Sequence, residues 1–93
     1  ERLSRDLSII VEQRHAHTAL VRAMRDAGGA LLEQVALRDR YSGAPIPQGS
    51  VGLTYTLTFR DPARTLTDDV VDRAQAAVVH AVTRDFRASL RAA

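Results

Sequence analysis

The sequence predicts an α+β domain in which two helices cover one face of a four-stranded antiparallel sheet. Three observations indicate this class. Residues 6–11 and 51–59 alternate apolar and polar side chains with the period of two that half-buried strands show. Residues 17–27 and 68–86 instead repeat apolar side chains at helical spacing. Between two of the expected strands, residues 42–50 contain two prolines and two glycines, which is typical of a rigid hairpin loop.

The first strand and the first helix follow from residues 6–29. Leu7, Ile9 and Val11 lie on one side of the strand, because successive side chains alternate between the two faces of a sheet. The helix over residues 17–27 carries its apolar side chains on one face. The pair Gly28–Gly29 ends it, since glycine tolerates the left-handed conformation of a helix C-cap.

The second and third strands flank the hairpin loop. The second is expected over residues 32–41, with Val35 and Leu37 directed inward. The third, over residues 51–59, has the clearest alternation in the chain. One of its faces is apolar and the other carries small polar residues; the apolar face consists of Leu53, Tyr55, Leu57 and Phe59.

Thr67 is the expected N-cap of a long helix over residues 68–86, and Asp68 and Asp69 suit the positive end of its dipole. A short last strand over residues 88–91, with Leu90 inward, completes the order strand–helix–strand–strand–helix–strand. This order is the split βαβ or ferredoxin-like arrangement, which leaves one face of the sheet open.

Length and composition indicate one domain spanning residues 1–93. The absence of cysteine excludes disulfides and thiolate metal sites and fits a reducing, cytoplasmic compartment. No apolar run approaches the ~20 residues of a membrane span, so no membrane is expected. All 13 basic residues are arginine, which is typical of a GC-rich coding sequence. Whatever its origin, a guanidinium stacks on bases and forks onto phosphates better than an ammonium does.

The spacing of titratable residues predicts no catalytic residue, no metal site and no cofactor in this domain. His15 and His17 lack a third ligand nearby, so we expect solvated histidines there. His80, on the long helix, is expected to be half-exposed. Acidic residues crowd the start of the long helix and could serve acid–base chemistry, but helix capping is a sufficient explanation.

Four motifs occur in a fixed order between residues 5 and 68, and they carry a resemblance that runs from about residue 4 to the C-terminus. They are Arg5-Asp6-Leu7, the hairpin Tyr41–Gly49, Leu57-Thr58-Phe59, and Asp61-Pro62-Ala63-Arg64-Thr65-Leu66-Thr67-Asp68. In these motifs the chain resembles the ferredoxin-fold anticodon-binding domain at the C-terminus of the β chain of bacterial phenylalanine–tRNA ligases.

The resemblance implies a module that binds the anticodon stem-loop of phenylalanine tRNA and is not catalytic by itself. The full enzyme of that family uses ATP and Mg²⁺, and the chemistry belongs to other domains of the β chain and to the α chain. Those domains and the α chain are therefore the expected protein partners.

The open sheet face is the expected RNA-binding surface, because splayed bases stack on such sheets. The candidates are Tyr41, Arg38, Arg40, Gly52, Thr54, Thr56 and Ser50. The resemblance implies that Tyr41 stacks on an anticodon base; the alternative is that Tyr41 packs at the core edge. Strict alternation places Tyr41 on the face opposite Arg38 and Arg40. Either the strand bulges or twists near Tyr41, or only one set faces the ligand; the arginines can also be a solvated face.

Two further functions stay open on the residues alone: a protein-interaction domain and a small-molecule-sensing domain of the same fold. The stretch Ser50-Val51-Gly52 lacks the cation that relatives often carry there, which predicts weaker attraction of phosphate through the loop. Binding to tRNA that weakens steeply with salt would favour the RNA-binding hypothesis.

Overall fold

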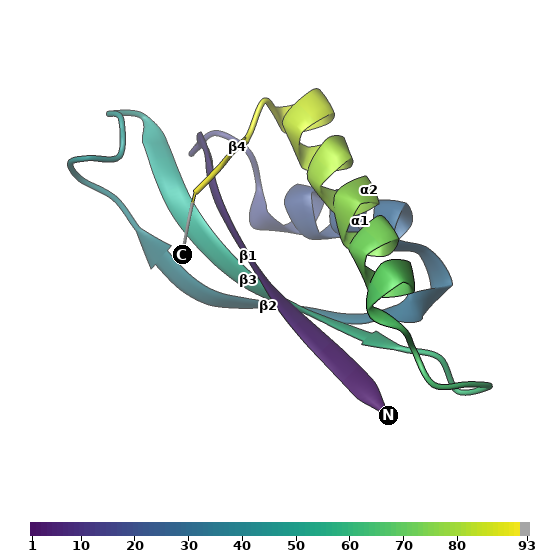
Figure 1. The fold of residues 1–93 in the computed structure, drawn as a ribbon. Coiled ribbons are helices and arrows are strands. Elements are labelled where there is room, and N and C mark those ends of the chain that lie inside the picture. Colours follow the sequence, from purple (N-terminus) through teal and green to yellow (C-terminus); the bar gives the residue numbers. More distant parts are fainter. Residues whose placement is uncertain (92–93) are drawn as a thin grey trace.

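The predicted elements follow one another in the predicted order in a computed structural model that describes residues 1–91 (Figure 1). In chain order they are β1 (Arg2–Glu12), α1 (His17–Gly28), a short 3₁₀ turn (Gly29–Leu31), β2 (Leu32–Tyr41), β3 (Ser50–Arg60), α2 (Asp68–Phe86) and β4 (Ser89–Leu90). The second strand therefore has the bounds expected from the sequence.

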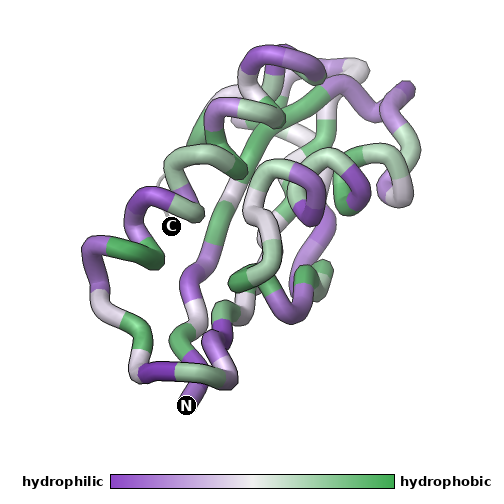
Figure 2. The backbone as a smooth tube through the Cα atoms, turned by 90° about the vertical axis from the view of Figure 1, so that its right-hand side faces the viewer, coloured by the Kyte–Doolittle hydropathy of each residue, from purple (hydrophilic) through white to green (hydrophobic). Residues whose placement is uncertain are grey.

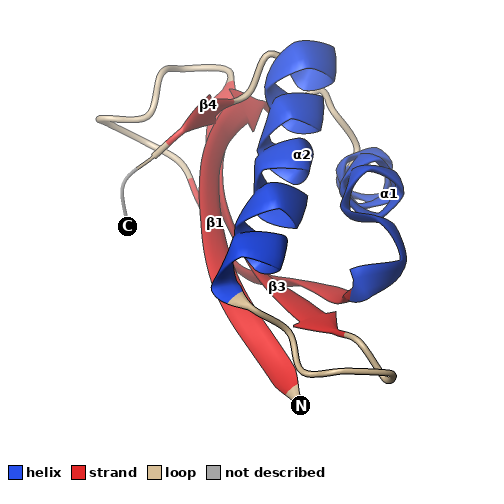
Figure 3. Cartoon of the chain, turned by 45° about the vertical axis from the view of Figure 1, so that its right-hand side comes forward, coloured by secondary structure: helices blue, strands red, loops and turns tan. Residues whose placement is uncertain are grey.

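The strands form one antiparallel sheet in the order β2-β3-β1-β4. Both helices lie on the same side of this sheet, and the opposite face is uncovered (Figure 3). The predicted fold class is thus confirmed. We call the uncovered side the open face; its β3 residues are Ser50, Gly52, Thr54, Thr56 and Thr58.

The core lies between the helices and the other side of the sheet. On β3, Leu53, Tyr55, Leu57 and Phe59 are each at most 5% exposed, as the alternation predicts. Figure 2 shows how polar and apolar segments alternate along the backbone of the strands. Both helices add buried side chains to the same cluster: Leu20, Met24, Val71, Val78 and Val82.

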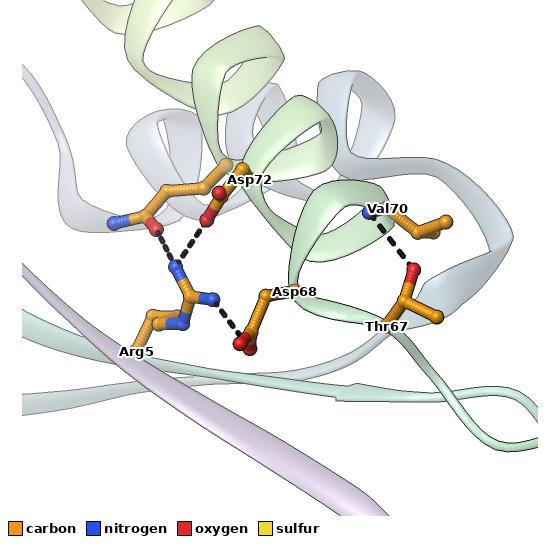
Figure 4. A network of polar contacts seen from close by, with 6 residues as sticks. Arg5, Thr67, Asp68, Val70 and Asp72 are labelled. Carbon is orange, nitrogen blue, oxygen red and sulfur yellow. Dashed lines mark hydrogen bonds and ion pairs between the residues drawn. The ribbon is translucent and has the colours of Figure 1, made fainter.

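The acidic start of α2 has a structural partner in β1 (Figure 4). The Arg5 guanidinium donates to Asp72 Oδ1 at 2.7 Å and lies 3.4 Å from Asp68 Oδ1. Thr67 Oγ1 accepts from the Val70 backbone N–H at 3.4 Å and so caps the helix as predicted. The contacts with Arg5 give Asp68 and Asp72 a structural role at the start of α2.

The last strand differs from its prediction. β4 contains only Ser89 and Leu90, and Leu90 is 56% exposed, so its expected inward position is wrong. β4 pairs with Ile9 and Ile10 at the outer edge of the sheet. Ala88 is buried instead, and its backbone N–H donates to Val82 O at 3.2 Å as the chain leaves α2.

Two histidines expected in solvent pack against aromatic rings. His17 Nδ1 lies 3.0 Å from Tyr55 Oη, and their rings are parallel. His15 is half-buried with its ring edge-on to Phe86, at 5.0 Å between centroids. The expectation of a solvated histidine is therefore wrong for His15, while His80, expected to be half-exposed, is exposed.

Candidate nucleic-acid interface

Short polar side chains cover the middle of the open face. Cross-strand pairs between β1 and β3 place hydroxyls next to one another, with Ser8 Oγ 2.9 Å from Thr54 Oγ1. Ser4 and Thr58 form a second such pair at 3.4 Å. Because these side chains are short and hydrogen-bonded, the face is a low, polar platform that larger side chains can overhang.

A β-bulge in β2 decides which residues join this platform. The register steps from Leu37 opposite Tyr55 to Asp39 opposite Thr54, so Arg38 is an extra residue. Beyond it the alternation is reset, and Tyr41 lies opposite Gly52 on the open face. The sequence left two explanations open for the position of Tyr41: a bulge or twist in the strand, or only one set of residues on the ligand side. The structure shows a bulge.

The bulge separates the two arginines of β2. Arg38 Nε donates to Thr56 Oγ1 at 3.2 Å, so Arg38 shares the open face with Tyr41. Arg40 lies opposite Leu53, a core-facing residue, and therefore falls on the helix side of the sheet. Of the candidates from the sequence, the structure brings Tyr41, Arg38, Gly52, Thr54, Thr56 and Ser50 to one face, without Arg40.

The ring of Tyr41 lies directly on the backbone of Gly52. A Cβ at position 52 would be 2.5 Å from Tyr41 Cζ and 2.9 Å from Cδ2, which is closer than real contacts allow. Glycine is therefore needed at this position for the ring to rest on the sheet. The ring stays half-buried, and Gly52 is covered by it.

Arg91 completes the surroundings of Tyr41 and comes from the opposite edge of the sheet, where β4 ends. Its guanidinium carbon lies 4.8 Å from the centroid of the Tyr41 ring, within cation–π distance. Its backbone N–H donates to Ser8 O at 2.9 Å, which anchors the residue beside β1. Sequence reasoning missed Arg91, because residues 41 and 91 meet only through the strand order and no local pattern marks them.

Comparisons with known proteins identify the family of this chain. The family model of the ferredoxin-fold anticodon binding domain matches residues 1–91. The chain belongs to this family. The phenylalanine–tRNA ligase beta subunit of Moorella thermoacetica is 42% identical over 89 residues, which is 96% of this chain and 11% of that protein. The beta subunit of Nocardia farcinica is 44% identical over 86 residues, 92% of this chain and 10% of its own length. The chain thus spans about a tenth of the curated relatives that it matches.

In this anticodon-binding domain the hairpin loop between β2 and β3 is tied down at several points. Ile46 N donates to Gly43 O at 2.8 Å, and the Ile46 side chain is only 5% exposed. Gln13 N donates to Gly49 O at 3.0 Å and joins the loop to the end of β1. Gly43 and Gly49 have positive φ, which suits glycine. The loop therefore supports Tyr41 from its own side of the strand.

The arginines near Tyr41 keep their charges available. Six arginines of the domain form ion pairs with carboxylates: Arg2, Arg5, Arg14, Arg60, Arg64 and Arg84. Within residues 1–91, Arg38, Arg40 and Arg91 form none. Of these three, Arg91 lies beside the Tyr41 ring and Arg38 shares its face of the sheet, whereas Arg40 lies on the helix side. Cationic groups combined with an aromatic ring are typical of surfaces that bind single-stranded nucleic acid.

Residues 1–91 contain no group of three His, Asp or Glu side chains placed to hold a metal ion. No helix over these residues is long and apolar enough to cross a membrane. A groove of about 680 Å³ lies between α1 and α2, lined by alanines and by charged residues that include the Arg84–Asp85 ion pair. The groove belongs to the helix layer, on the opposite side of the sheet from Tyr41.

Proposed function

We propose that this chain is the anticodon-binding module of a phenylalanine–tRNA ligase β chain and that it binds the anticodon stem-loop of phenylalanine tRNA through the open face. The module positions the tRNA and performs no chemistry itself. Aminoacylation with ATP and Mg²⁺ is then the task of the other β-chain domains and of the α chain, which are its partners in the enzyme. Family membership and the relatives' names support this assignment.

The observation that carries the proposal is the position of the Tyr41 ring. One side of the ring rests on Gly52, and the planar guanidinium of Arg91 lies over the ring. A guanidinium is flat and stacks on aromatic faces as a base does. The position of the Arg91 guanidinium therefore shows that a planar group fits over the Tyr41 ring. An anticodon base would take that position, and Arg91 would turn toward the RNA.

Substitution of Tyr41 tests the proposal. Base–aromatic stacking contributes roughly 1–3 kcal/mol per base, so Tyr41→Ala should weaken binding of the stem-loop by about 5- to 150-fold. Tyr41→Phe keeps the ring and should keep most of the affinity. The measurement is a titration of the phenylalanine tRNA anticodon stem-loop, with the anticodon GAA, against each variant at several salt concentrations.

Leu37→Ala is the matched control, because Leu37 lies on the same strand, on the helix side, and is also partly exposed. Melting curves must first show that each variant folds. Unchanged affinity of a folded Tyr41→Ala variant would remove the stacking role and leave Tyr41 as a packing residue at the edge of the sheet.

A further inference from the structure

A chain of hydrogen bonds crosses three strands of the open face beside the Tyr41 site. Thr56 Oγ1, on the central strand β3, donates to Asp6 Oδ1 on β1 at 3.0 Å. The same oxygen accepts from Arg38 Nε on β2 at 3.2 Å. A single hydroxyl thus holds the guanidinium of Arg38 from one side and is itself oriented by a carboxylate.

The terminal nitrogens of Arg38 remain available for a ligand. A guanidinium has five N–H donors, and the bond to Thr56 uses only the one on Nε. Arg38 is exposed and forms no ion pair with any residue in the range 1–91. The fork of the two terminal nitrogens suits either a phosphate or the edge of a base.

The charges around Arg38 favour a base over a phosphate. Asp6 lies one hydroxyl away, and Asp39 follows Arg38 in the chain and falls on the open face opposite Thr54. Two carboxylates therefore accompany one guanidinium, so the local formal charge is −1. This net negative charge would repel a phosphate. The edge of a base is uncharged, so the guanidinium can donate to its acceptors and the carboxylates can accept from its amino group.

The distance from Tyr41 leaves room for a separate nucleotide. Gly52 and Thr56 are four residues apart on β3, which corresponds to about 13 Å along a strand. A base stacked on Tyr41 and a base held by Arg38 would belong to different nucleotides of the same loop.

Resting on the function proposed above, we propose that Arg38, positioned by Thr56 and Asp6, reads the N7 edge of a purine that neighbours the base stacked on Tyr41. Adenine and guanine both present the N7 acceptor on this edge, and pyrimidines do not. Arg38 thereby selects a purine at one anticodon position, and Asp6 is a positioning residue that does not need to touch the RNA.

The test uses GAA stem-loops in which each purine of the anticodon is replaced in turn by its 7-deaza analogue, which removes N7 and changes no charge. One of these replacements should weaken binding to the wild-type chain by roughly 5- to 150-fold. The same replacement should have little effect on Arg38→Ala, whose affinity is already lowered. Because no phosphate contact is lost, the salt slope of Arg38→Ala should equal that of wild type.

Asp6→Ala should reduce the effect of the 7-deaza replacement while the chain stays folded. Ser4→Ala is its control, since Ser4 lies two residues before Asp6 on the same face of β1 and its hydroxyl is 3.4 Å from Thr58 Oγ1. Equal 7-deaza effects in wild type and Arg38→Ala would overturn the proposal, as would a salt slope that falls by about one in Arg38→Ala, the mark of a phosphate contact. The proposed function, by contrast, would be contradicted if the wild-type chain did not bind the stem-loop or if Tyr41→Ala had no effect on binding.

Discussion

The two faces of β3 are built from alternate residues of the same eleven-residue strand and serve different purposes. The helix-side face carries large apolar side chains that are almost completely buried, such as Leu57 and Phe59. The open face carries small residues: Gly52, which the Tyr41 ring covers, and partly exposed threonines such as Thr54 and Thr58. Stability is thus concentrated on one side of the strand, which frees the other side to be shaped for a ligand.

The contrast has a physical basis in side-chain size. Burial of a large apolar side chain contributes roughly 1.5–3 kcal/mol, whereas short hydroxyl side chains on a solvated sheet contribute little. The open face can therefore change its residues at small cost to the fold. Its important feature is the small size of its side chains, because the absence of a Cβ at Gly52 allows the Tyr41 ring to lie on the sheet.

The largest expected effect comes from breaking the helix-side face. Phe59→Ala removes a fully buried ring and should lower the free energy of unfolding by roughly 3–5 kcal/mol. The neighbouring Thr58→Ala, on the open face, should change it by less than about 1 kcal/mol. Denaturant unfolding of both variants measures the difference, and similar losses would contradict the assignment of the two faces.

A second prediction concerns Tyr55, the one side chain with a polar tip on the helix-side face of β3. Burial raises its pKa to about 12, from an ordinary value of 10.0. Above pH 10 the unfolded chain loses this proton and the folded chain keeps it, so rising pH favours unfolding. The free energy of unfolding should fall by up to about 1.4 kcal/mol per pH unit between pH 10 and 12.

Unfolding curves across this pH range check the prediction, with Tyr55→Phe as the control. The variant retains the ring and lacks the ionisable group, so its stability should depend less on pH. Equal slopes for the two chains would show that the Tyr55 phenol does not resist ionisation in the folded state.

The smallest expected effect on stability, with a specific effect on binding, comes from Gly52→Ala. The added methyl group collides with the Tyr41 ring and should lift it from the sheet. Binding of the anticodon stem-loop should weaken by up to about 1–3 kcal/mol, the contribution of one stacked base. Melting should change little, because Gly52 lies outside the left-handed region of backbone angles.

The double variant Tyr41→Ala/Gly52→Ala sharpens this test. If the glycine acts through the ring, the two substitutions together should weaken binding no more than Tyr41→Ala alone. Additive losses would show that the backbone at position 52 contacts the RNA independently of Tyr41.

Most of the fold could be predicted from the sequence because each strand and helix carries its own periodicity and end signals. For example, Gly29 marks the C-terminal end of α1, and Thr67 is the N-cap of α2. The exposure of Leu90 could not be predicted, since it depends on where the last strand meets the outer edge of the sheet.

The site was less accessible to sequence reasoning. A bulge at Arg38 has no composition signal, although the conflict between Tyr41 and the arginines of β2 pointed to one. Arg91 reaches Tyr41 from the opposite edge of the sheet, and Asp6 and Arg38 meet only through Thr56. Contacts between residues this far apart in sequence depend on strand order and register, which periodicity does not specify.

The contacts of Tyr41 also bear on the entropy of binding. Immobilising a free, rotamer-rich side chain at an interface costs roughly 0.5–1.5 kcal/mol. The ring of Tyr41 already rests on the backbone of Gly52 before any RNA arrives, and only the Arg91 guanidinium has to move aside for a base. A base that stacks on this ring therefore meets a preorganised surface, and little of the stacking energy is lost in ordering the protein.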